Sequence, residues 1–132
     1  MTNEEKQLLL ADLCARLPYG VKLETDDGVE ILDTLIVSNG WINASYDIDE
    51  VKPYLRPMSS MTEEEKEKLL SIIREETHII CEKLKNNDCG IEEGKYHFYN
   101  ILELDFLLSH HFDYRGLIDK GLALEAPEGM YH

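Results

Sequence analysis

The chain has 132 residues, of which 43% are hydrophobic and 30% are charged, and its formal net charge at pH 7 is −14. This length and composition predict one folded domain over residues 1–132 and exclude a chain that is disordered throughout. The apolar runs are far shorter than the ~20 residues that a membrane-spanning helix needs. The acidic charge is spread along the chain, which disfavours direct binding to nucleic acid or to an anionic membrane surface.

The N-terminal residues and the cysteines predict a cytoplasmic protein. Glu4 and Glu5 stand where a secretory signal would carry basic residues. Cys14, Cys81 and Cys89 are an odd number of cysteines without a CxxC pair, which favours reduced thiols over a disulfide framework. The apolar neighbours of Cys14 and Cys81 predict that both thiols face the core.

The first predicted element is a helix that begins at Thr2 and ends near Leu17. Thr2 and Glu5 have the spacing of a capping box, in which each side chain bonds to the other residue's backbone N–H. Pro18 and Gly20 then stop the helix. Its apolar stripe is expected to cover the strands that follow, and it consists of Leu9, Leu10, Leu13, Cys14 and Leu17.

Residues 21–46 predict a three-stranded antiparallel meander. Apolar and polar residues alternate in the strands, and Asp-Asp-Gly and Ser-Asn-Gly supply the turns. The expected strands are 21–25, 29–37 and 41–46, and the expected turns are 26–28 and 38–40. The stretch 47–55 is too short for periodicity to separate a fourth strand from a single helical turn, so both alternatives stay open.

Two further helices are predicted after Pro53 and Pro57. Thr62 and Glu65 repeat the capping spacing and predict a long central helix from about Glu63 to Lys85. Residues 98–110 are apolar nearly all round, which predicts a third helix that is buried on more than one side.

The predicted fold class is therefore α+β, with two differently patterned halves in one domain. Residues 1–57 contribute a helix and the β-meander, and residues 58–132 contribute the helical half and a tail. A small, curved antiparallel meander would pack with three helices, which are N-terminal, long central and buried C-terminal. An extended C-terminal tail would complete the fold.

Side chains that could carry chemistry are few. His110, His111 and Asp113, with His97 upstream, form the only cluster of potential metal ligands in the sequence. Neighbouring helical residues point about 100° apart, so His110 and His111 could share a metal only if the helix ended there. Imidazoles that complement a helix dipole are the simpler interpretation. We predict no metal, no cofactor and no enzymatic activity.

The candidate interaction surface combines one residue of the sheet with residues of the tail. Trp41 opens a predicted strand and is either a core side chain or a ligand platform. Tyr114 and Arg115 are residue types favoured at interfaces, although with Asp113 they also fit a salt-linked turn that pins the tail to the body. Four apolar tail residues should dock on the protein itself or on a second subunit, which would make a homo-oligomer. These are Leu117, Ile118, Leu122 and Leu124.

Two stretches carry a resemblance to other proteins. PYLRPMSSMTEEEKE, over 53–67, and HFDYRGLIDKGLALEAPEGMY, over 111–131, resemble a recurring set of small uncharacterised proteins of gut Bacteroidales and of the phages and prophages that infect them. The resemblance covers about a quarter of the chain. It implies a bacterial or phage cytoplasmic origin, and it implies no reaction, cofactor or catalytic residue.

We expect a non-enzymatic phage or mobile-element protein that binds an unidentified protein partner through the curved sheet or the tail. One alternative is a counter-defence protein that sequesters a small anionic signalling nucleotide, which would need basic residues to converge at an oligomer interface. Another alternative is an acidic protein that imitates DNA and thereby inhibits a DNA-binding protein.

Overall fold

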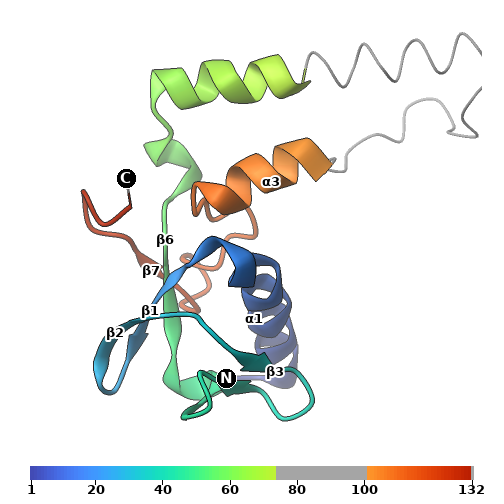
Figure 1. Cartoon of the computed structure of the whole chain (residues 1–132), viewed down its shortest axis with the longest axis vertical. Coiled ribbons are helices and arrows are strands. Elements are labelled where there is room, and N and C mark those ends of the chain that lie inside the picture. Colours follow the sequence, from blue (N-terminus) through green and yellow to red (C-terminus); the bar gives the residue numbers. More distant parts are fainter. Residues whose placement is uncertain (74–100, 132) are drawn as a thin grey trace, which may run out of the picture. The chain divides into compact units, whose positions relative to one another are not determined.

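The computed structural model describes residues 1–73 and 101–131, and these form a small α+β fold (Figure 1). This confirms the predicted fold class. The chain divides into two compact units, each described here by itself. One unit contains residues 1–60 together with the segment from Leu107 onward, and the other lies within residues 61–106. The C-terminal segment therefore groups with the first 60 residues rather than with the central helix.

Helix α1 (Asn3–Arg16) begins with the predicted capping box. The Thr2 hydroxyl accepts the Glu5 N–H at 3.1 Å, and the Thr2 N–H donates to a Glu5 carboxylate oxygen at 3.0 Å. A short 3-10 turn, η1 (Leu17–Tyr19), ends the helix at Pro18, as expected.

The buried face of α1 differs from the predicted stripe in one apolar position. Leu9 and Leu13 are fully buried, whereas Cys14 is exposed. The prediction that Cys14 faces the core is wrong, because the buried face extends from Leu13 toward Asp12, and Cys14 lies about 100° around the helix on the other side of Leu13. The buried face is completed instead by Asp12 and Arg16.

A four-stranded sheet has the order β2-β1-β6-β7. The hairpin of β1 (Lys22–Thr25) and β2 (Gly28–Ile31) forms as predicted. Strand β6 (Lys52–Leu55) pairs antiparallel with β1, and β7 (Leu124–Glu125) pairs parallel with β6. The tail thus supplies a strand, where only extended chain and turns were expected.

A separate three-stranded antiparallel sheet contains β3 (Leu35–Ile36), β4 (Trp41–Ile42) and β5 (Tyr46–Asp47). The Ser-Asn-Gly turn joins β3 to β4 as predicted, but strands over 29–37 and 41–46 do not form. The prediction of one meander over 21–46 is therefore corrected to two sheets.

The reason is the polar side chain of Asn43. Asn43 and Ala44 have positive φ angles of 51° and 60°, which ends β4 after Ile42. The Asn43 amide oxygen accepts the Asp33 and Thr34 N–H groups, and its NH₂ donates to the Ile31 carbonyl. These three bonds hold the chain in a non-strand conformation between β2 and β3.

Both alternatives for 47–55 are present, because a 3-10 turn η2 (Ile48–Glu50) precedes β6. The core of this unit lies between α1, the two sheets and the C-terminal segment. The segment docks on its own chain, since its side chains share this core with residues of α1, β1 and β6. Fully buried members include Leu9, Leu13, Val21, Leu23, Ile42, Leu55 and Leu117.

In the other unit, a helix over 63–73 begins with the predicted cap. The Thr62 N–H donates to a Glu65 carboxylate oxygen at 2.9 Å, and the Thr62 hydroxyl accepts the Glu65 N–H at 3.2 Å. The rest of the predicted helix to Lys85, including Cys81, lies outside the described residues. A 3-10 turn, η3 (Met58–Ser60), lies just before it in the first unit.

Helix α3 (Ile101–Ser109) lies within the predicted range 98–110. Phe106, Leu107 and Leu108 are all buried at successive positions, so α3 is covered on more than one side, whereas Leu102 is exposed. No helix in the described part of the chain combines the length and the apolar character needed to cross a membrane.

Candidate functional site

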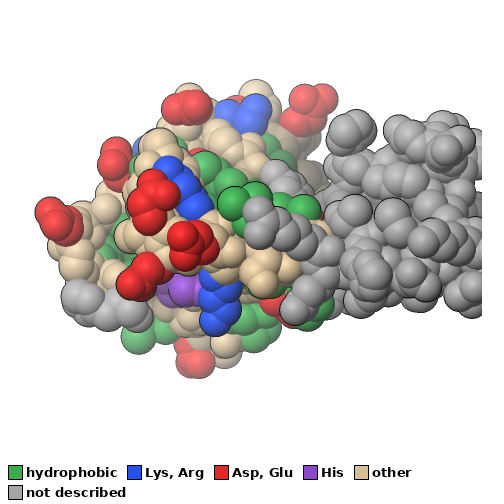
Figure 2. Space-filling model, turned by 90° about the horizontal axis from the view of Figure 1, so that it is seen from above, with side chains coloured by type: hydrophobic (Ala, Val, Ile, Leu, Met, Phe, Trp, Pro, Cys, Tyr) green, Lys and Arg blue, Asp and Glu red, His purple; other side chains and the backbone are tan. Residues whose placement is uncertain are grey.

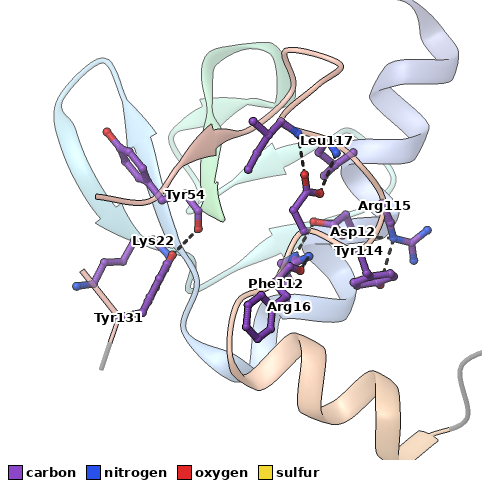
Figure 3. Close-up of polar contacts among 11 residues, drawn as sticks. Asp12, Arg16, Lys22, Tyr54, Phe112, Tyr114, Arg115, Leu117 and Tyr131 are labelled. Carbon is purple, nitrogen blue, oxygen red and sulfur yellow. Dashed lines mark hydrogen bonds and ion pairs between the residues drawn. The ribbon is translucent and has the colours of Figure 1, made fainter. Parts of the chain in front are cut away.

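A buried ion pair on α1 anchors the C-terminal segment (Figure 3). Arg16 Nε donates to Asp12 Oδ2 at 2.7 Å, and Arg16 Nη2 donates to the Phe112 carbonyl at 2.7 Å. Both side chains are fully buried. Because a charge buried without its partner is costly, this pair fixes where residue 112 must lie against α1.

Tyr114 and Arg115, two residues of the predicted interaction surface, join the same pair. Arg115 Nε lies 3.3 Å from Asp12 Oδ1 and donates to the Tyr114 hydroxyl at 3.2 Å. The guanidinium of Arg16 lies 5.5 Å from the centre of the Tyr114 ring. Arg115 thus forms a salt link that pins the tail, as the salt-linked turn required, but its partner is Asp12 on α1 rather than Asp113. The sequence analysis did not identify Asp12 as the partner of these residues. The available signal was the i,i+4 spacing of Asp12 and Arg16 within an apolar stripe.

Asp113 caps the turn that follows. Its two carboxylate oxygens accept the N–H groups of Leu117 at 2.8 Å and Ile118 at 3.0 Å. Asp113 is therefore committed to backbone groups, and no cluster of three potential metal ligands is found among residues 1–73 and 101–131. His97 lies outside the described residues.

His111 is buried and stacks on Tyr131, with the ring centres 3.7 Å apart. Burial, and after it the nearby charge of Arg16, lower the pKa of His111 to about 4. The imidazole is therefore neutral at pH 7 and serves as a flat packing surface.

The apolar tail residues of the predicted surface belong to the core or its edge. Leu117 is fully buried and Leu122 is 3% exposed, whereas Ile118 and Leu124 are partly buried. Leu124 lies in β7, opposite Tyr54. These side chains are covered by the chain's own residues.

The hydroxyl of Tyr131 bridges two strands where their ladder opens. The β1–β6 register places Leu23 opposite Pro53, so Lys22 and Tyr54 are the next pair. The Tyr131 hydroxyl accepts the Lys22 N–H at 2.9 Å and donates to the Tyr54 carbonyl at 2.7 Å (Figure 3). Burial raises the pKa of Tyr131 to about 12, which keeps this donor protonated.

The two sheets are joined by a second phenol. Tyr46 on β5 donates toward Asp27 Oδ2 at 2.6 Å and also contacts Glu30 Oε2. The hydrogen bonds to Asp27 and then Glu30 raise the pKa of Tyr46 to about 12. The Thr25 hydroxyl lies 3.2 Å from Glu30 Oε2 and completes the cluster.

Trp41, the remaining member of the predicted surface, lies on the solvent side of the three-stranded sheet. Directly opposite residues point to the same face, so the register places Ile36, Trp41 and Asp47 in one row across three strands. The neighbouring row of Leu35, Ile42 and Tyr46 faces the core instead. Trp41 is 42% exposed and Ile36 is 48% exposed.

We call Ile36, Trp41 and Asp47 the Trp41 row. The interpretation of Trp41 as a core side chain is wrong, because the period-2 alternation places Ile42 in the core. The sequence analysis did not identify Ile36 and Asp47 as members of this surface. What they share is that each lies directly opposite Trp41 on a neighbouring strand. Val37, beside the row in sequence, is 59% exposed and extends the apolar character of the hairpin.

On the face shown in Figure 2, acidic side chains are scattered over the surface, with fewer basic side chains between them.

Comparison with protein-family models, with curated proteins and with solved structures returned no match to this chain. The surface itself must therefore support any functional proposal.

Proposed function

We propose that this protein is a non-enzymatic binding module that contacts a protein partner through the Trp41 row. The observation that supports this proposal is the exposure of Ile36 and Trp41 side by side on one sheet face, next to the exposed Val37. Contiguous apolar side chains at a surface are typical of interaction sites, and tryptophan is enriched among the residues that dominate binding energy.

The other residues of the predicted surface support the choice of the Trp41 row, because they already contact residues of this chain. Leu117 and Leu122 lie in the core, and Arg115 is paired with Asp12. The same pairing argues against the nucleotide alternative, since Arg16 and Arg115 already share one carboxylate. The bacterial or phage origin that the sequence resemblance implies stays a prediction, and it selects the cell extract for the test below.

The proposal is tested by affinity capture from an extract of a gut Bacteroidales bacterium. We compare the wild type with a row variant, Ile36→Ser with Trp41→Ser, and with a matched control, Val29→Ser with Ile31→Ser. Val29 and Ile31 are 52% and 56% exposed on β2, so the control removes similar apolar surface from another sheet.

We expect the same partner with the wild type and the control, and its loss with the row variant. Circular dichroism confirms that all three proteins are folded. The proposal is contradicted if the row variant retains the partner, or if the wild type captures nothing that the row variant does not.

A further inference from the structure

The Trp41 row contains a charged group as well as apolar surface. Asp47 stands directly across from Trp41 on β5 and is exposed. Its carboxylate makes no hydrogen bond or ion pair with any residue that the structure describes, and although Asp47 precedes η2 it does not cap that turn. The indole and the carboxylate are thus neighbours, and both are available to a partner.

A partner that covers Trp41 must also compensate the negative charge of Asp47. An apolar partner would remove water from the carboxylate without replacing its hydrogen bonds, which is strongly unfavourable for a charged group. A nucleic acid would bring phosphates to a carboxylate on a chain of net charge −14. A second copy of this chain would bring the same negative charge, so self-association is also opposed.

Arginine fits the three groups of the row together. Its planar guanidinium stacks on an indole and forms paired hydrogen bonds with a carboxylate, and its methylene groups pack on an aliphatic side chain. Lysine brings the same charge, but its ammonium is more strongly hydrated and cannot form the planar bidentate pair. The row offers an indole at Trp41, a carboxylate at Asp47 and an aliphatic surface at Ile36.

We propose that the Trp41 row binds an arginine side chain presented by a basic segment of the partner protein. This inference rests on the proposed function and names the chemistry of the partner. The arginine would lie over Trp41, with its guanidinium paired to Asp47 and its methylene groups against Ile36.

The test uses the fluorescence of Trp41, which is the only tryptophan in the chain. The full-length protein is titrated, at an ionic strength of about 0.15 M, with a short blocked peptide in which Arg alternates with Thr. Counterpart peptides carry Lys or Gln in place of each Arg. We expect a saturable change with the Arg peptide, affinity about tenfold weaker with the Lys peptide, and no change with the Gln peptide.

Asp47→Asn is compared with Asp49→Asn, which removes the same charge two residues away. Asp49 is exposed and pairs with Lys6 at 3.5 Å, outside the row. Asp47→Asn should weaken binding of the Arg peptide about tenfold, and Asp49→Asn should change it less than about twofold. Ile36→Ser should also weaken binding.

Equal affinity for the Arg and Lys peptides, or equal losses in the two Asp variants, would overturn the inference, because net charge alone would then explain binding. Absence of any response to the Arg peptide would also overturn it. A partner whose capture requires Trp41 and is undiminished in Asp47→Asn would refute the arginine inference and leave the proposed function intact.

Discussion

At the scale of single residues, two tyrosine hydroxyls link strands by hydrogen bonds that lie outside the backbone ladders. Tyr131 inserts its hydroxyl between Lys22 on β1 and Tyr54 on β6, and Tyr46 links β5 to the β1–β2 turn. Backbone groups withdrawn from water are costly when unpaired, so the Tyr131 hydroxyl, which reaches two partly buried ones, has a stabilising role that its ring alone does not explain.

Tyr131→Phe keeps the ring stacked on His111 and removes the bridging hydroxyl. We expect the free energy of unfolding to fall by ~1–3 kcal/mol, because the Lys22 N–H and the Tyr54 carbonyl lose their partner. Urea denaturation measures this change. Tyr54→Phe is the control, since its hydroxyl bonds to Glu24 on the outer face of the sheet. Equal losses in the two variants would show that the bridge has no special role.

His111 predicts a pH dependence of stability. Its pKa falls from 6.5 to about 4 on folding, first because of burial and then because of the Arg16 charge. Between these values the unfolded chain binds more protons, so the His111 contribution is complete above pH 6.5 and is lost as the pH falls toward 4. The slope is at most about 1.4 kcal/mol per pH unit.

The measurement is urea denaturation at several pH values between 7 and 4 for the wild type and His111→Asn. Asparagine tolerates the positive φ of 62° at this position. The variant should show a shallower loss of stability over this pH range. A slope unchanged in His111→Asn would mean that other groups cause the dependence.

At the scale of elements, the C-terminal segment is part of the fold rather than an appendage. Leu117 and Leu122 lie in the core, β7 pairs with β6, and the Ala126 N–H donates to the Leu55 carbonyl at 2.8 Å. The segment therefore contributes both apolar burial and backbone pairing to the first unit.

Truncation after Arg115 should abolish cooperative unfolding of the first unit. Each buried leucine contributes ~2–5 kcal/mol, which is comparable with the total stability of a small domain. Leu122→Ala in the full chain should lower the free energy of unfolding by ~2–5 kcal/mol. Glu128→Ala, at an exposed position, is the control. A truncated chain that keeps the wild-type melting temperature would contradict this account.

Elements set by neighbouring residues could be predicted, and elements set by distant residues could not. Both capping boxes and both turns follow from residues a few positions apart, as at Thr2 with Glu5. The parallel pairing of β7 with β6 joins Leu124 to Tyr54, which no local pattern encodes. Strand β4 ends after Ile42 because the Asn43 side chain bonds to the distant Ile31 carbonyl. Hydrophobic alternation alone does not contain this contact, so the predicted strand 41–46 was too long.

At the scale of the whole molecule, the pattern of apolar residues and turns predicted the α+β class but not the position of the surface. Trp41 and Leu117 were both apolar candidates for that surface, yet one is 42% exposed and the other is fully buried. The difference arises from register in one sheet and from the anchoring of the tail by Asp12 and Arg16, both of which require the folded chain. The net charge of −14 creates an electrostatic field that reaches farther than any single contact, and this field favours a basic partner.

Acrylamide quenching of tryptophan fluorescence tests most directly whether the Trp41 row is a free binding surface. The chain has one tryptophan, so the signal comes from this row alone. We predict ready quenching in the free protein and protection once the captured partner is added. A tryptophan that is already shielded in the free protein, or that stays equally accessible in the complex, would contradict the account.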